Sequence, residues 1–439
     1  MNFRLRRQEA SIQRLQRLLQ ERQRERITYP EDRHQYRIRN AISRIQEAIL
    51  QELQHLEILQ RQQGDAFEVC HASEVVLKEG GLTMYEAEIV VRRLRADETL
   101  TSLRLERCFS SRALTKILEA VGDSTTFKKI RFKKSRAVDE CEITAALNRN
   151  SSLEHLSIYC MSPDLSGVLE TMLSQSDSLK SLVLFKCDMD PFWEACLARC
   201  LQHNQTLTDI DIATPRATSE EATLTLLESI RHLPLERLGL RGFVVGETVL
   251  GTILSDFQTL ELLKLDQNGI GAMGIASLAS SLQNHEKLKR LDLSRNHIGD
   301  EGLRTLLQAA THLNELELKY VGMTDVGMAA FEKTLPSMTS LTSLSMREFT
   351  YSSRGIRCLI QGLQHNYSLT SVSVWPETAD SLTLDLYLRA NRAGRGALRR
   401  EGFRLQPALW PLILERTQRY GSDVMFLFLR EQAQSLFAR

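Results

Sequence analysis

The sequence predicts an α/β solenoid, a horseshoe with a parallel sheet on its concave side and helices on its convex side. The first observation is a six-residue pattern, L-x-x-L-x-L, that occurs eleven times between residues 100 and 374. The second is its period: the second apolar position recurs every 25 to 28 residues, which is typical of repeat proteins. These positions are Leu103, Ile130, Leu156, Leu182, Ile210, Leu238, Leu263, Leu291, Leu316, Leu344 and Val372.

Each repeat is expected to contain a short strand followed by a helix. The residues x-L-x-L-x alternate with a period of two, which indicates a strand that buries one face. Segments that follow, such as residues 271–282, carry apolar residues at helical spacing, as at Ile275, Leu278 and Leu282. Because a helix is wider than the distance between neighbouring strands, the stacked repeats must curve with the sheet inside.

The repeats resemble those of the leucine-rich repeat family, in its ribonuclease-inhibitor-like class. The likeness rests on the spacing and on the segments DQNGIGAMG and SRNHIGDEG, in which Asn268 and Asn296 complete the pattern L-x-x-L-x-L-x-x-N. Cys108 and Cys187 stand at the same position, where the family uses either residue. We assign residues 63–376 to the solenoid, about eleven repeats after an N-terminal half-repeat, and expect each Asn to bond unpaired backbone groups in the turn.

Residues 1–62 form an Arg- and Gln-rich extension with a helix-forming composition, thirteen arginines and no lysine. Residues 31–61 carry apolar residues at every third or fourth position, which must be buried. This stripe predicts a coiled coil and thus a homo-oligomer, a helical hairpin folded on the first repeat, or a helix that forms with a partner. An organellar transit peptide is a further alternative, because the first twenty residues are Arg-rich and amphipathic. The stripe consists of Ile38, Ile42, Ile45, Ile49, Leu53, Leu56 and Leu59.

Residues 377–439 are predicted to form a helical C-terminal cap, with helices over 381–390, 408–419 and 423–438. The last repeat of a solenoid exposes an apolar edge that a cap must cover. An alternative is a tail that docks a partner or acts as a degron. The tail is also similar to those of uncharacterised algal leucine-rich repeat proteins. The residues expected to cover the edge are Trp410, Leu412, Ile413, Phe426, Leu427 and Phe428.

Composition gives general limits on the function. The net charge of +1 creates no overall field toward nucleic acid or membrane, and the absence of an 18-residue apolar run predicts no membrane-spanning helix. Eight scattered cysteines fit a reducing compartment better than a disulfide framework. We therefore expect a cytoplasmic protein, with nuclear and organellar locations as alternatives.

The residues between the strand leucines should line the concave sheet. Repeat 2 is basic, repeats 3 and 4 carry aromatic residues, and repeat 5 is acidic. Exposed aromatic residues beside charges are typical of binding hot spots, although the rings can instead pack only on each other and the charges can simply be solvated. The predicted partner-binding residues are Lys129, Arg131, Lys133, Tyr159, Val183, Phe185, Asp209, Asp211, Arg237 and Arg241.

No motif predicts catalysis, a cofactor or a metal ion. Cys196, Cys200 and His203 have a spacing that a metal could use, but no fourth ligand is evident, and packing between helices explains the cysteines better. Asn204 and Asn366 suit left-handed turns at helix ends. No phosphate-binding loop or nucleophile motif occurs.

We therefore expect a non-enzymatic scaffold that binds a protein on its concave face. The resemblance implies one alternative, because activators of small GTPases share this repeat class, but they should carry an acidic tail and this tail is basic to neutral. A second alternative is nucleic-acid binding through the extension and repeat 2. We rank an acidic protein above nucleic acid, since one basic strand is too narrow for a duplex.

Overall fold

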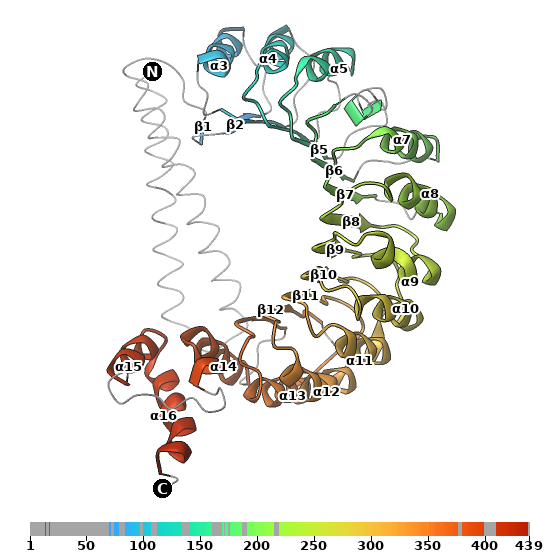
Figure 1. The fold of residues 1–439 in the computed structure, drawn as a ribbon. Coiled ribbons are helices and arrows are strands. Elements are labelled where there is room, and N and C mark those ends of the chain that lie inside the picture. The colour runs from blue at the N-terminus through green and yellow to red at the C-terminus, as the bar shows by residue number, and fades with distance from the viewer. Residues whose placement is uncertain are drawn as a thin grey trace.

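The computed structural model is an open arc with strands along its inner side and helices along its outer side (Figure 1). It describes residues 14, 17, 70–71, 74–78, 84–96, 100–106, 112–133, 140–159, 169–170, 172–173, 176–186, 191–214, 219–348, 350–375, 380–398 and 410–437. The predicted coiled coil over 31–61 lies outside the described residues, as does the rest of the extension except Arg14 and Arg17.

A single sheet runs through the whole arc in sequence order. The strands from β2 onward are parallel, and β1 pairs with β2 in the antiparallel direction. The repeated apolar positions of neighbouring strands stand directly beside each other: Leu103 is in register with Ile130, and Leu291 with Leu316. The predicted solenoid and its register are therefore confirmed. The strands are β1 Cys70–His71, β2 Glu74–Lys78, β3 Ser102–Glu106, β4 Lys129–Lys133, β5 His155–Tyr159, β6 Ser181–Phe185, β7 Asp209–Ala213, β8 Arg237–Arg241, β9 Leu262–Lys264, β10 Arg290–Asp292, β11 Glu315–Glu317, β12 Ser343–Ser345 and β13 Ser371–Ser373.

Helices follow the strands and pack side by side on the convex side (Figure 1). Their inner faces meet the buried side of the sheet in one continuous core, in which Leu103, Leu182 and Leu278 are fully buried. The helices are α3 Met84–Ala96, α4 Arg112–Gly122, α5 Glu140–Arg149, α7 Pro191–His203, α8 Glu220–Ile230, α9 Glu247–Asp256, α10 Ala272–Leu282, α11 Gly299–Ala309, α12 Asp325–Thr334, α13 Ser353–Gln364, α14 Asp380–Ala393, α15 Trp410–Gln418 and α16 Ser422–Phe437, with 3-10 turns η2 Leu335–Ser337 and η3 Arg395–Leu398.

The two asparagines of the repeat pattern bond the turns that leave the strands. Oδ1 of Asn296 accepts from the backbone N–H of Asn268 at 2.9 Å and of Ile270 at 3.0 Å. Its Nδ2 donates to the carbonyls of Leu265 and Leu293, each at 2.8 Å. Asn268 makes the same kind of bonds one repeat earlier: its Oδ1 accepts from the N–H of Phe243, and its Nδ2 donates to the carbonyl of Leu240. The expected role of these side chains is thus confirmed.

The prediction of left-handed turns at Asn204 and Asn366 is wrong. Neither has a positive φ. Instead, Asn366 Nδ2 donates to the carbonyl of Leu335 at 2.8 Å in the previous repeat, and its Oδ1 accepts from the N–H of Leu369 at 2.9 Å. Asn204 bonds in the same way. The side chain closes the turn, so the backbone does not need a strained conformation.

Acidic residues connect the helix N-termini of successive repeats. Asp325 accepts from the N–H of Ser352 at 2.8 Å and of Gly355 at 2.9 Å. A Cβ on Gly355 would lie 2.7 Å from Asp325 Oδ1, so the glycine makes this approach possible. Asp300 contacts Thr324 and Gly327 in the same way one repeat earlier.

Replacing Asp325 with alanine should lower the free energy of unfolding by about 1 kcal/mol, as the loss of a helix cap does. The N–H of Ser352 holds the pKa of Asp325 below its usual range. A carboxyl whose folded pKa is lowered stabilises the fold above its unfolded pKa of about 3.9 and loses this effect as the pH falls through the folded value. In denaturant titrations the difference from wild type should therefore shrink from pH 7 toward pH 3. Asp177→Ala, an exposed control, should change little; an equal loss at every pH would contradict the ionic role.

The C-terminal helices continue the solenoid. α14 packs on α13, and α16 packs on α14. Val424, Leu427 and Phe428 are buried, but Leu412 is 62% and Phe426 66% exposed, so the prediction that these last two cover the core is wrong. Helical spacing explains this, since residues 424, 427, 428 and 431 share the face that α16 turns inward. No helix in the described part of the chain is both long enough and apolar enough to span a bilayer.

Candidate functional site

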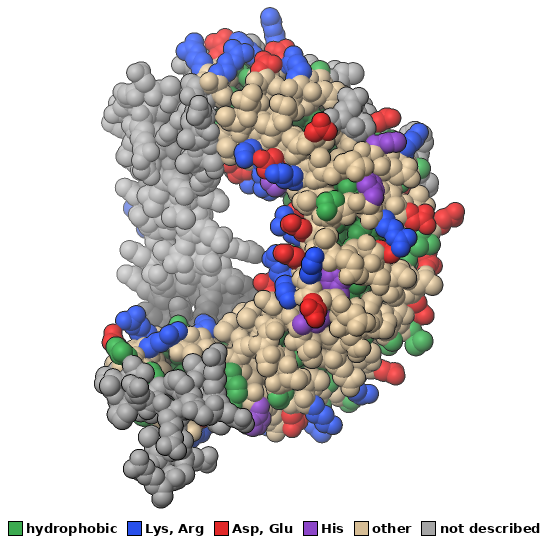
Figure 2. Space-filling view, in the orientation of Figure 1, with side chains coloured by type: hydrophobic (Ala, Val, Ile, Leu, Met, Phe, Trp, Pro, Cys, Tyr) green, Lys and Arg blue, Asp and Glu red, His purple; other side chains and the backbone are tan. Residues whose placement is uncertain are grey.

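The predicted concave residues do lie on the open face of the sheet. In β3 and β4 the leucine-type positions are buried and the residues between them are not. Lys129, Arg131 and Lys133 follow one another along β4, and Tyr159 and Phe185 end β5 and β6. Figure 2 shows basic and acidic side chains gathered together along the inner edge of the arc.

The acidic part of the predicted site is neutralised by bases on later strands. Arg237 Nε lies 3.1 Å from Asp209 Oδ2, and Lys264 Nζ lies 2.8 Å from Asp211 Oδ2. Lys264 reaches across β8 because Gly239 stands between them, where a Cβ would lie 2.7 Å from Asp211 Oδ1. Asp209 and Asp211 are therefore members of ion pairs and do not form a separate acidic patch.

Two other predicted bases are also paired. Arg241 bonds Asp266 through Nε, and Lys133 Nζ lies 3.2 Å from Glu106 Oε1. By contrast, Lys129 and Arg131 form no ion pair with any residue that the structure describes. Sequence reasoning missed Asp266 and Lys264 as partners because they lie 25 and 53 residues from the groups they bond.

Aromatic and cationic side chains from the middle of β4 and from the ends of β5, β6 and β8 meet on the concave face. The Tyr159 and Phe185 ring centroids are 5.5 Å apart at an interplanar angle of 38°. The guanidinium carbon of Arg131 lies 5.7 Å from the Tyr159 centroid, and that of Arg241 lies 5.4 Å from the Phe185 centroid. Such geometry gives favourable cation–π contacts. We call these four residues, with Lys186, the aromatic–cation cluster.

Lys186 joins the cluster through an unusual backbone conformation. Its φ is 53°, a left-handed value that costs a non-glycine residue energy. Its N–H donates to the Ala213 carbonyl at 2.7 Å, and its Nζ lies 5.7 Å from the Phe185 ring centroid. Gln267 and Arg295, which like Lys186 directly precede the Asn or Cys position of their repeats, also have a positive φ. The conformation therefore belongs to the turn of the repeat, a signal that the prediction of the site did not use.

The surface beside the cluster is formed by short or uncharged side chains. Ser157 and Val183 stand next to each other on β5 and β6, beside Arg131. His155 lies opposite Lys129. Burial lowers the pKa of His155, and the positive charge of Lys129 lowers it further. His155 therefore adds no charge at neutral pH.

The two cysteines considered as metal ligands are buried on α7. Their Sγ atoms are 4.0 Å apart, and Cys196 and Cys200 belong to the core. Burial raises the pKa of Cys200 to about 12, so its thiol stays protonated, whereas metals bind the thiolate. The described residues contain no group of three or more His, Cys, Asp or Glu side chains suited to a metal ion.

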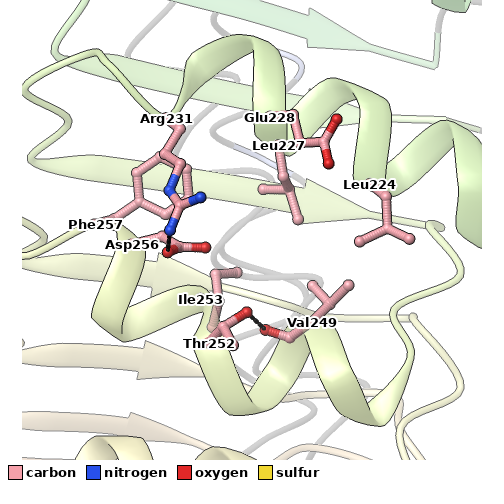
Figure 3. Close-up of a pocket in the computed structure, with 9 residues that line it drawn as sticks. All are labelled: Leu224, Leu227, Glu228, Arg231, Val249, Thr252, Ile253, Asp256 and Phe257. Atoms are coloured by element: carbon pink, nitrogen blue, oxygen red, sulfur yellow. Dashed lines mark hydrogen bonds and ion pairs between the residues drawn. The ribbon is translucent and has the colours of Figure 1, made fainter.

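A groove of about 240 Å³ opens on the convex side between α8 and α9 (Figure 3). Leu227, Val249 and Ile253 form its apolar floor, and Leu224 at its rim is 39% exposed. Arg231 and Asp256 close one end by bonding each other. Glu228, an exposed residue, also lines the groove. Several cations and aromatic rings meet at the aromatic–cation cluster, so the cluster is the better candidate for recognition.

Comparison with protein families gives one match. The family model described as "Leucine Rich repeat" matches residues 284–307, from the turn after α10 through β10 into α11. No curated protein gives a significant match. The comparisons do not support the expected likeness of the C-terminal tail to algal proteins.

Comparison with solved structures gives similar folds at low sequence identity. A chain of the "Crystal structure of Rad7 and Elc1 complex in yeast" is 18% identical with a TM-score of 0.50, covering 70% of this chain and 76% of that chain. "Leiomodin-1 Actin-Binding Site 2 (ABS2)" is 15% identical with a TM-score of 0.32, covering 35% of this chain and 92% of that chain. The tropomodulin C-terminal domain of Caenorhabditis elegans is 18% identical with a TM-score of 0.30, covering 36% of this chain and 98% of that chain. At these identities the likeness concerns the fold alone.

Proposed function

Because this chain is a leucine-rich repeat protein, we propose that it is a non-enzymatic scaffold that binds a protein partner on the concave face of its solenoid. The observation that carries the proposal is the aromatic–cation cluster. Tyr159 and Phe185 are half-buried rings on the open side of a sheet, where nothing in the repeat pattern requires an aromatic residue. Aromatic and Arg side chains together dominate binding energy at protein interfaces.

The rest of the concave face supports the same proposal. Its ion pairs hold the side chains around the cluster in one arrangement, so a partner meets a preorganised surface. The similar yeast chain was solved in a complex of two proteins, Rad7 and Elc1, which agrees with protein binding by this fold. The described residues give no support to regulation of a small GTPase.

Replacing Tyr159 and Phe185 together with alanine should weaken partner binding by about 2 kcal/mol, or roughly 30-fold, because central aromatic anchors contribute most of an interface's energy. Affinity capture from a cell lysate, quantified against wild type, measures the loss. The control removes two exposed apolar side chains from convex helices, Met273→Ala with Val326→Ala, which are 68% and 62% exposed. Recovery of the same partners in unchanged amounts by the aromatic variant would refute the proposed surface.

Three finer points stay predictions. They are the ribonuclease-inhibitor-like repeat class, the cytoplasmic location and the homo-oligomer through residues 31–61. The first depends on repeat details that a match over residues 284–307 does not cover. The third concerns residues outside those that the structure describes.

A further inference from the structure

Among the described residues of β3 to β8, the uncompensated charge on the concave face lies on β4. Arg290 on β10 also has no ion pair with the described residues, but it stands next to Glu315 on β11. The bases of the neighbouring strands are paired: Arg104 bonds Glu74 at 3.0 Å, and Lys133 bonds Glu106. The acids of β7 are paired with Arg237 and Lys264. Lys129 and Arg131 have no ion pair within the described part of the chain. Two adjacent cations of one strand thus lack the compensation that their neighbours have.

Arg131 is held in position but its hydrogen-bonding capacity is unused. The Tyr159 ring supports its guanidinium at 5.7 Å, and Arg104, directly opposite on β3, turns to Glu74 and Glu106. The guanidinium makes no hydrogen bond with the described residues, and its buried Nε is unpaired. Because Nε is buried, the donors open to a partner are the N–H groups of the two Nη atoms, which can bond the two oxygens of a carboxylate.

The arrangement of the rings distinguishes between classes of partner. Bases of a single-stranded nucleic acid stack on open aromatic faces. Here Arg131 covers Tyr159, whereas Arg241 and Lys186 cover Phe185. The faces are occupied by cations and the rings also contact each other. Apolar side chains can still pack against the ring edges and Val183, so a peptide fits this surface better than stacked bases.

We infer that the surface over β4 to β6 binds an acidic segment of a protein partner, with carboxylates on Lys129 and Arg131 and an apolar or aromatic side chain against Tyr159 and Phe185. This inference rests on the proposed function and specifies the chemistry of its partner. The floor between the two groups consists of His155, Ser157 and Val183, which bring no competing charge. An acidic segment is expected because its carboxylates complement the positive charges of Lys129 and Arg131.

Binding of labelled synthetic peptides to the full chain tests the inference. The first probe alternates Glu and Phe; the second has Gln for Glu; the third has Ser for Phe. At low salt the Glu/Phe peptide should bind, and each replacement should weaken binding on the order of tenfold. Binding should also weaken at about 0.5 M salt, since partly exposed ion pairs are screened. A Gln/Phe peptide that binds as well as the Glu/Phe peptide would overturn the inference.

Charge reversal locates the binding on the concave face. Lys129→Glu with Arg131→Glu should weaken binding of the Glu/Phe peptide on the order of tenfold or more. Arg290→Glu with Arg295→Glu makes the same change in net charge on and beside β10 and should have little effect. Equal losses in the two variants would indicate attraction by overall charge alone and would reject the site. Unchanged thermal unfolding verifies that both variants are folded.

Further outcomes separate this inference from the proposed function. Tighter binding of a labelled oligothymidylate than of the Glu/Phe peptide, lost in the β4 variant, would replace the acidic peptide with nucleic acid. If partner capture depends on Tyr159 and Phe185 but the Glu/Phe peptide does not bind, the concave scaffold stands and the acidic partner is rejected. If the Glu/Phe peptide binds through Lys129 and Arg131 as expected, the inference is supported.

Discussion

Replacing Arg395 with alanine should lower the free energy of unfolding of the C-terminal cap by about 3–5 kcal/mol, as breaking a buried ion pair does. Arg395 is 2% exposed. Its Nε and Nη2 lie 3.0 and 2.9 Å from the Glu431 carboxylate. The Tyr367 and Tyr387 rings lie on it with centroids 4.8 Å from the guanidinium carbon.

The size of this effect follows from what the substitution leaves behind. Arg395 also donates to the carbonyls of Leu363 and Gln364 at the end of α13. Alanine would leave these carbonyls and the carboxylate of Glu431 without their main donor in a buried site, and uncompensated buried charge is strongly destabilising. Lysine cannot replace the planar fork, so Arg395→Lys should be only a partial rescue.

Hydrogen exchange and limited proteolysis of α14 and α16, together with denaturant titration, measure the loss. Because each unit of a solenoid contacts mainly its neighbours, the damage should concentrate in the cap and the last repeat. Arg419→Ala is the matched control: Arg419 is 76% exposed beside Glu415 and should change stability by less than about 0.5 kcal/mol. Removing both charges, with Arg395→Met and Glu431→Leu, should recover part of the loss. Equal stability of Arg395→Ala and wild type would contradict the structural role.

Replacing Asn296 with alanine should destabilise the central repeats by about 3–5 kcal/mol, since an unsatisfied buried polar group costs about 1–3 kcal/mol. The side chain of Asn296 is 1% exposed and bonds five backbone groups of two successive turns. Partial relaxation and buried water should keep the loss below the full sum.

The matched control is Asn284→Ala. Asn284 is exposed and its side chain makes no hydrogen bond with the described residues, so its loss should fall within about 0.5 kcal/mol. Denaturant titration followed by circular dichroism compares the two variants. Because Asn268 repeats the bonding pattern of Asn296, Asn268→Ala should resemble Asn296→Ala. A loss no larger than that of Asn284→Ala would show that the hydrogen bonds of Asn296 do not stabilise the fold.

Most of the repeat architecture was predictable from sequence, because its signals are local. Alternation around Leu103 or Leu291 specifies a strand with one buried face, and helical spacing at Ile275, Leu278 and Leu282 specifies the buried face of α10. The strand β1, Cys70–His71, was missed since two residues carry no periodicity. The exposure of Phe426 was missed because a uniformly apolar run does not reveal which face is inward.

The candidate site was predictable only as a set of positions. The sequence places Tyr159, Phe185 and Arg131 on the concave face through the period of the strands. It does not tell which charges are compensated, because Asp211 is paired with Lys264, 53 residues away. The left-handed conformation of Lys186, whose N–H bonds the next repeat, was missed because the prediction of the site did not use the turn of the repeat.

Local periodicity is therefore sufficient to specify this solenoid, its register and the residues on each face, because burial of leucine every second or third residue depends on near neighbours in the chain. Contacts between repeats decide which charges on the concave face are compensated. Stacking brings together side chains that are 25 or more residues apart, and their pairing neutralises Asp209 and Asp211 while it leaves Lys129 and Arg131 open to a partner. The repeated L-x-x-L-x-L pattern builds the surface, and the packing of its variable residues decides what that surface can bind.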